Sequence, residues 1–104
     1  MREFFKQKTF MEKVCKIQAI GNYEEKDRRD GNGKFKKITV RLKDGSDEFV
    51  AEATDDLAST LNENKIPVGT NVSVLCRLRV SDWKDENGNP RTSTYINIVN
   101  LIVL

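Results

Sequence analysis

The sequence contains no histidine and only two cysteines, Cys15 and Cys76. Without histidine the chain lacks the commonest general base, which excludes Ser-His-Asp and Cys-His catalysis and every zinc site that uses histidine. The two cysteines lie far apart and form no C-x-x-C motif, which also excludes a four-cysteine zinc site. We therefore expect no bound metal.

Long apolar runs and a strong charge imbalance are also missing. The longest apolar run, residues 101–104, is far shorter than the roughly 20 residues that a membrane span needs. The charged N-terminal residues have no apolar stretch behind them, so they do not resemble a signal peptide. We expect a cytoplasmic protein with reduced thiols and no membrane contact. The net charge of +2 does not by itself indicate nucleic-acid binding.

A chain of 104 residues is long enough for one domain with one hydrophobic core. No repeat, proline-rich linker or low-complexity segment divides it. We expect a leader over residues 1–12 and a single folded domain over residues 13–104.

Alternation of apolar and polar residues predicts five β-strands. They are expected over residues 13–23, 35–43, 48–53, 72–83 and 92–103. Leu57, Ala58 and Leu61 recur at helical spacing and predict a short helix over residues 55–64, which Thr54 or Asp55 can cap. Segments 24–34 and 84–91 are rich in charge and glycine, and we expect them to be loops.

Three strands, one helix and then two strands is the element order of the OB-fold, a five-stranded Greek-key barrel. A β-sandwich is the alternative, but a single helix at this place is less expected there. We therefore predict an all-β OB-fold barrel with one short helix between the third and fourth strands.

Strand alternation also predicts which side chains point away from the barrel. In segment 35–43 the inward residues are Ile38, Val40 and Leu42. The outward set of that segment is Phe35, Lys37, Thr39, Arg41 and Lys43. In segment 72–83 the inward set is Val72, Val74, Cys76, Leu78 and Val80, and the outward set is Ser73, Leu75, Arg77, Arg79, Ser81 and Trp83. Both outward sets combine cations with an aromatic ring, as single-stranded nucleic-acid binders do.

Each of these residues also has a purely structural interpretation. Outward lysines and arginines are often only solubilising, and Trp83 or Phe35 can cover an end of the barrel. Phe49 has the parity of Ala51 and Ala53, so we expect it in the core. Tyr95 alternates with the inward Ile96 and Ile98 and should point outward, either on the binding face or on the far side of the barrel.

No catalytic constellation is evident. Cys15 and Cys76 have inward parity and are expected to be buried apolar residues rather than reactive thiols. Gly31-Asn32-Gly33 lacks the Gly-Lys-Ser/Thr continuation of a phosphate-binding loop. Asp55 and Asp56 are expected at a helix start, where carboxylates favour the helix dipole. We expect a protein that is not an enzyme and that needs no cofactor.

The segment before and within the last two predicted strands carries a further pattern. It contains Val68-Gly69-Thr70, Arg77-Leu78-Arg79, Trp83-Lys84-Asp85, Asn87-Gly88-Asn89, Arg91 and Thr92-Ser93-Thr94. This order resembles the bacterial single-stranded-DNA-binding (SSB) proteins, well over residues 66–100 and weakly over residues 13–60. The resemblance implies an OB-fold, single-stranded DNA (ssDNA) as the partner, base stacking on Trp83 and a homo-oligomer, either dimer or tetramer.

Two departures from the family pattern matter. The opening Asn-x-x-x-Leu-x-Gly motif is matched only by the glycine of Ile20-Gly21-Asn22, and the sequence ends at Ile102-Val103-Leu104 without the long, acidic-tipped tail of the family. We therefore expect DNA binding without tail-mediated recruitment of partner proteins. A short version of this kind would suit a phage, a plasmid, a conjugative element or a primosome-type accessory protein.

The leading hypothesis is a non-enzymatic protein that coats or protects ssDNA in replication or recombination. The cations expected to meet phosphates are Lys37, Arg41, Lys43, Arg77 and Arg79. The rings expected to stack on bases are Phe35, Trp83 and Tyr95. The cations expected from the two loops are Arg28, Arg29, Lys34 and Arg91.

Two other hypotheses remain open. The first is an OB-fold module for protein interaction that binds nucleic acid weakly or not at all. The small net charge, the outward Glu48 and Glu52, and the apolar Phe4, Phe5 and Phe10 favour it. The second is a binder of RNA, similar to cold-shock proteins.

Overall fold

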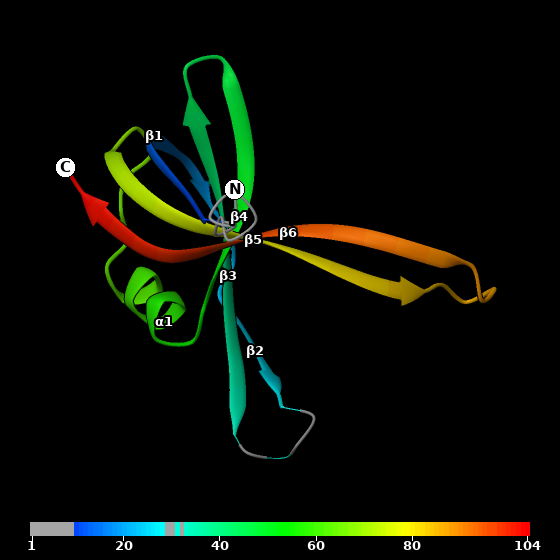
Figure 1. Ribbon diagram of the computed structural model, residues 1–104. Helices are drawn as coiled ribbons and strands as arrows, with labels where there is room; N and C mark the ends of the chain where they lie inside the picture. Colours follow the sequence, from blue (N-terminus) through cyan, green and yellow to red (C-terminus); the bar gives the residue numbers. More distant parts are fainter. Residues whose placement is uncertain (1–9, 29–30, 32) are drawn as a thin grey trace, which may run out of the picture.

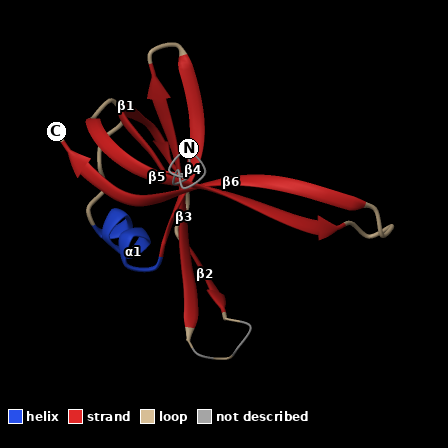
Figure 2. Ribbon diagram, in the orientation of Figure 1, coloured by secondary structure: helices blue, strands red, loops and turns tan. Residues whose placement is uncertain are grey.

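A computed structural model describes residues 10–28, 31 and 33–104, in which six strands and one helix follow one another (Figures 1 and 2). The elements are β1 (Phe10–Ile20), β2 (Glu24–Asp27), β3 (Lys34–Asp44), β4 (Asp47–Thr54), α1 (Asp55–Glu63), β5 (Asn71–Lys84) and β6 (Pro90–Val103). Strands β1, β3, β4, β5 and β6 are the five predicted from the sequence, and α1 lies at the predicted place. The first strand begins three residues before its predicted start and also ends three residues early.

The prediction of a loop over residues 24–34 is wrong at its beginning, because Glu24–Asp27 forms β2 and extends β3 into a hairpin. This strand is entirely charged and exposed, so it shows no apolar alternation. Its acidic residues lie opposite lysines instead: Glu24 opposite Lys37, Glu25 opposite Lys36 and Asp27 opposite Lys34. Opposite charges across an antiparallel pair stabilise the pairing.

The strands close into a ring in the order β1-β5-β6-β4-β3, with β2 added at the edge of β3. Strand β1 closes the ring, because it pairs with β5 over residues 10–16 and with β3 over residues 16–20, with a register shift between Ile17 and Ala19. Strands β4 and β6 meet in parallel only at Glu52 and Asn97. At the end of β1, the Gly21 amide donates to the Thr39 carbonyl at 2.7 Å, an approach that leaves little room for a side chain.

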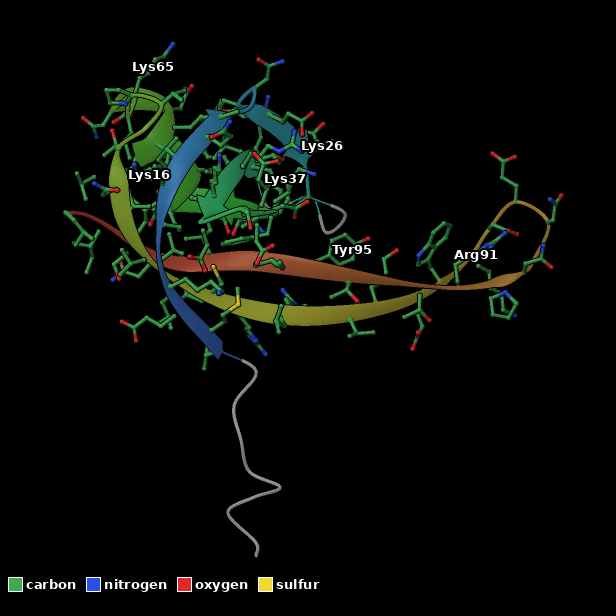
Figure 3. The ribbon with its side chains drawn as sticks, turned by 90° about the horizontal axis from the view of Figure 1, so that it is seen from above. Lys16, Lys26, Lys37, Lys65, Arg91 and Tyr95 are labelled. Atoms are coloured by element: carbon green, nitrogen blue, oxygen red, sulfur yellow. The ribbon has the colours of Figure 1, made fainter. Side chains whose placement is uncertain are left out.

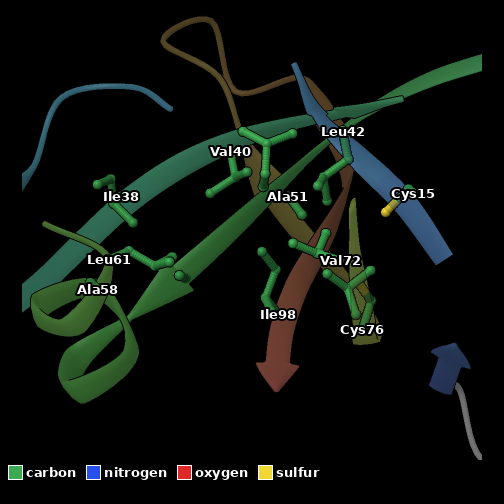
Figure 4. Close-up of a cluster of buried hydrophobic side chains, with 13 residues drawn as sticks. Cys15, Ile38, Val40, Leu42, Ala51, Ala58, Leu61, Val72, Cys76 and Ile98 are labelled. Carbon is green, nitrogen blue, oxygen red and sulfur yellow. The ribbon is translucent and has the colours of Figure 1, made fainter. Parts of the chain in front are cut away.

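The core fills the ring and is covered at one end by α1 (Figure 4). Its buried members are Cys15, Ile17, Ile38, Val40, Leu42, Ala51, Ala53, Ala58, Leu61, Val72, Val74, Cys76 and Ile98. The inward parity predicted for β3 is therefore confirmed, and Phe49 packs against the core as expected. Burial raises the pKa of both thiols, so neither Cys15 nor Cys76 is an activated nucleophile.

The prediction that Leu78 and Val80 point into the core is wrong, so it fails for the second half of β5. Leu78 and Val80 are 39% and 68% exposed, because β5 and β6 leave the barrel beyond a bulge at Leu75/Cys76 and continue as a projecting hairpin, here called the arm. Figure 1 shows the arm extending from the barrel at a wide angle to the β2–β3 hairpin. The two hairpins bound the face of the barrel described next.

Candidate functional site

The outward faces of β3 and β4 form the floor between the two hairpins. Residues directly opposite each other in an antiparallel pair share a face. Lys37 lies opposite Thr54, Arg41 opposite Val50 and Lys43 opposite Glu48, so the cations predicted on β3 share one face with the outward residues of β4. This face continues onto β6 through the Glu52–Asn97 pairing.

The arm presents a second set of predicted residues on a single face. Arg77 lies opposite Asn97, Arg79 opposite Tyr95 and Trp83 opposite Arg91. Tyr95 and Trp83 are 41% and 48% exposed. The indole Nε1 of Trp83 donates to Ser93 Oγ at 2.9 Å, which fixes the orientation of the ring. In Figure 3, Tyr95 and Arg91 lie on the side of the arm that faces the β2–β3 hairpin with Lys26 and Lys37.

A groove of about 510 Å³ joins these two faces. Its lining is Phe35, Glu52, Thr54, Asp55, Arg79, Val80, Ser81, Tyr95 and Asn97. Three predicted site residues, Phe35, Arg79 and Tyr95, therefore meet at one site although they come from three strands. The groove offers two aromatic rings and one guanidinium, together with two carboxylates and an amide.

Other predicted residues lie outside this groove. Trp83 and Arg91 border a smaller depression of about 240 Å³ near the end of the arm. Lys43 borders another depression of about 380 Å³ with Lys16. Arg29 falls outside the described residues. The predicted residues are therefore spread over three separate depressions and do not form a single compact pocket.

Most of the predicted cations already face a carboxylate. The pairs are Lys37 with Glu52 at 3.5 Å and with Glu24 at 3.9 Å, Arg41 with Glu48 at 3.6 Å, Arg28 with Asp55 at 3.0 Å, Lys34 with Glu25 at 4.0 Å and Arg91 with Asp85 at 3.0 Å. Within the described part of the chain, Lys43, Arg77 and Arg79 have no carboxylate within 4.0 Å. Ion pairs at a protein surface contribute little stability, so these pairs do not prevent the cations from also contacting a phosphate.

Phe35, Arg28 and Asp55 form a cluster at the edge of the groove. The Arg28 guanidinium carbon lies 5.8 Å from the centre of the Phe35 ring, within the range of a cation–π contact. The same guanidinium donates to Asp55 Oδ1. Asp55 has a φ of +51°, a left-handed conformation that few residues other than glycine adopt and that aspartate tolerates better than most. The start of α1 is therefore bent in a way that holds this carboxylate at the groove.

The loop at the end of the arm is organised by Asp85. Its Oδ1 accepts from the amides of Asn87 and Asn89, and its Oδ2 accepts from Arg91 Nε at 3.0 Å. These hydrogen bonds, the Asn89 amide first among them, lower the pKa of the Asp85 carboxyl. Gly88 adopts a φ of +78°, which a side chain would strain. The turn thus keeps Trp83 and Arg91 opposite each other across the arm.

Lys26 and Asn97 are two residues of this surface that sequence reasoning missed. Lys26 lies opposite Phe35 because β2 forms, and no apolar alternation signals that strand. Asn97 lines the groove, and its outward parity in the last strand was the signal that could have found it. Glu52 was recognised as outward-facing, but its place in the groove depends on the meeting of β4 and β6.

The part of the chain that the structure describes contains neither a metal-binding cluster nor a membrane-spanning helix. No cluster of three or more acidic or cysteine ligands could hold a metal ion there. No helix among residues 10–28, 31 and 33–104 is long and apolar enough to cross a membrane.

Comparison with solved structures decides the fold. The chain is similar to the mitochondrial single-stranded DNA-binding protein Rim1 of S. cerevisiae, with a TM-score of 0.60 and 12% identity over 94% of this chain and 96% of that one. It is also similar to the second OB-fold domain of replication protein A from Methanococcus maripaludis, with a TM-score of 0.63 and 17% identity over 89% of this chain and 81% of that one. The barrel has the OB-fold.

A third OB-fold neighbour is the small single-stranded DNA-binding protein of Streptomyces coelicolor, with a TM-score of 0.53 and 22% identity over 93% of this chain and 94% of that one. No protein-family profile matches the chain, and no curated protein matches it in sequence. At these identities the likeness establishes the fold alone, and the function has to be inferred from the chain's own residues.

Proposed function

We propose that the protein is a non-enzymatic, cytoplasmic ssDNA-binding protein that coats or protects the strand during replication or recombination. The observation that carries this proposal is the groove between the β3–β4 face and the arm, where Phe35, Tyr95 and Arg79 meet. OB-folds bind oligonucleotides on the corresponding strands and on the two hairpin loops that flank them. Of the three similar structures named above, two are single-stranded DNA-binding proteins and one is a domain of replication protein A.

The strand would follow the face of the arm and then cross the floor of the barrel. Its bases would stack on Trp83, Tyr95 and Phe35, and its phosphates would meet the cations around them. Stacking is worth about 1–3 kcal/mol per base and tolerates any sequence, because every base has a π-face. The cations expected to contact phosphates are Lys37, Arg41, Lys43, Arg77, Arg79 and Arg91, with Arg28, Arg29 and Lys34 from the β2–β3 hairpin.

A titration with a fluorescent 35-nucleotide oligo-dT tests this proposal against duplex DNA of the same length, at two salt concentrations. The single tryptophan, Trp83, reports stacking through quenching of its fluorescence. We expect single-strand binding that quenches Trp83 and weakens steeply with salt, because phosphate contacts release counterions. Absence of single-strand binding at low salt would refute the proposal. Equal affinity for ssRNA of the same sequence would point to the RNA-binding alternative.

A protein-interaction module is the second candidate function, and one observation favours it. Val14, Ser73 and Ile102 form a cross-strand row on the outer face of β1, β5 and β6, and both apolar members are exposed. Exposed apolar patches on a sheet often mark an interface. The same row would serve the homo-oligomer, dimer or tetramer, that the family resemblance predicts. Light scattering of the purified protein, with and without a Val14→Glu substitution, distinguishes a monomer from an oligomer held by this row.

A further inference from the structure

The groove contains carboxylates in a place where an ssDNA-binding surface would be expected to carry only cations and rings. Glu52 on β4 and Asp55 at the start of α1 line it together with Phe35 and Tyr95. Carboxylates repel phosphates, so the phosphates of a bound strand must lie against the cations of this surface, Arg79 among them, and not against Glu52 or Asp55. The parts of the strand left to meet the carboxylates are the edges of the bases.

The two carboxylates are held in place by neighbouring cations. Lys37 Nζ lies 3.5 Å from Glu52 Oε1, and Arg28 Nη2 lies 3.0 Å from Asp55 Oδ1. An ionised carboxylate only accepts hydrogen bonds and has about four lone-pair sites, so an ion pair leaves capacity for a further donor.

The four bases differ in what they offer to an acceptor. The Watson–Crick edge of guanine carries the N1–H and N2–H donors side by side, which match the two oxygens of one carboxylate. Adenine and cytosine carry an amino donor beside a ring nitrogen that accepts, and thymine carries one imino donor between two carbonyl oxygens. Proteins read unstacked bases on these edges. A carboxylate therefore attracts guanine and disfavours thymine.

We propose that the groove prefers guanine to thymine, with Glu52 and Asp55 accepting hydrogen bonds from the guanine edge while the base stacks on Tyr95 or Phe35. This inference rests on the proposed function and adds base selectivity to it. The rings bind every base, so the difference between bases comes from the carboxylates. A bidentate contact of this type discriminates between bases by about 5- to 150-fold.

The test measures affinity by fluorescence anisotropy for a 35-nucleotide oligo-dT and for the same strand with isolated dG residues spaced so that they cannot form quadruplexes. A third strand carries inosine, which keeps N1–H and lacks the N2 amino group, at the same positions. For the wild-type chain we expect the dG strand to bind at least threefold more tightly than oligo-dT, and the inosine strand to lose most of that gain. These comparisons need no variant, so they decide the proposal even if a variant fails to fold.

Glu52→Gln and Asp55→Asn remove the charge of each carboxylate, and Glu63→Gln, at the end of α1 and outside the groove, removes the same charge as a control. Because any lost negative charge raises the affinity for all DNA, the measured quantity is the dG-to-dT ratio within each variant. We expect at least one groove variant to bring the ratio close to one and the control to leave it unchanged. A wild-type ratio below threefold, or a ratio kept in both groove variants, would overturn the inference. Binding of all strands with equal affinity would contradict only the inference, whereas failure to bind any strand would contradict the proposed function.

Discussion

The substitution Trp83→Ala tests whether DNA binding depends on base stacking or only on positive charge. The indole is half exposed near the end of the arm. In the described structure its N–H donates one hydrogen bond, to the hydroxyl of Ser93 on the facing strand. Its loss leaves no polar group stranded in the core. Surface substitutions of this kind usually change the stability by less than about 0.5 kcal/mol, so the folded fraction should not change.

The expected magnitude follows from the stacking energy. One base stacked on an aromatic ring contributes about 1–3 kcal/mol. Since about 1.4 kcal/mol corresponds to a tenfold change, Trp83→Ala should weaken the affinity for oligo-dT by about 5- to 150-fold. Lys84→Ala is the matched control, because Lys84 adjoins Trp83 and alternation places its side chain on the opposite face of the arm. An exposed cation is worth at most about 1 kcal/mol, which corresponds to about fivefold.

The assay is anisotropy of a labelled 35-nucleotide oligo-dT, since the alanine variant no longer contains tryptophan. Circular dichroism and thermal melting of both variants show whether the fold is kept. Trp83→Phe retains a ring without the indole donor, so most of the affinity should be restored. A loss below about threefold for Trp83→Ala, or an equal loss for Lys84→Ala, would refute the stacking role.

Four further changes test other parts of the molecule. Arg79→Ala should reduce the slope of log affinity against log salt by about 0.7, measured by titration at several salt concentrations, and an unchanged slope would exclude a phosphate contact. Leu42→Ala should lower the free energy of unfolding by about 2–5 kcal/mol in urea titrations, because Leu42 is fully buried. Gly21→Ala should lower the melting temperature, because its Cβ would lie 3.2 Å from the Thr39 carbonyl oxygen; an unchanged value would show that the strands can separate there. The pKa of Asp85 is lowered in the fold from its ordinary 3.8, so its contribution to the order of the arm is present above that pH and is lost as the pH falls through the lowered value. The protection of the arm-loop amides, measured as their exchange rate relative to the intrinsic rate at each pH, should therefore fall there in the wild type and be low at all pH values in Asp85→Ala.

The sequence predicted the barrel well where one face of a strand is buried. Ile38, Val40 and Leu42 alternate with polar residues, and burial of one face makes that alternation visible in the sequence. The prediction was wrong for Leu78 and Val80, because the alternation continues after the strand has left the barrel. Strand β2 was missed for the opposite reason, since it is stabilised by charges across the pair and buries no side chain.

The candidate site, too, was predictable from the sequence only in part. The sequence identified Phe35, Arg79 and Tyr95 from their outward parity, each within its own strand. Their meeting in one groove depends on the pairing of β4 with β6 and on the angle at which the arm leaves the barrel, neither of which is encoded by local periodicity.

The sequence by itself determined the inward and outward faces of the strands within the barrel, the place of the helix and the absence of histidine chemistry, because these depend on residue type and on a local period of two or 3.6. Only the tertiary structure decided which cations face carboxylates and that Glu52 and Asp55 line the same groove as the aromatic rings. Those relations join residues far apart along the chain, and closure of the barrel sets their distances.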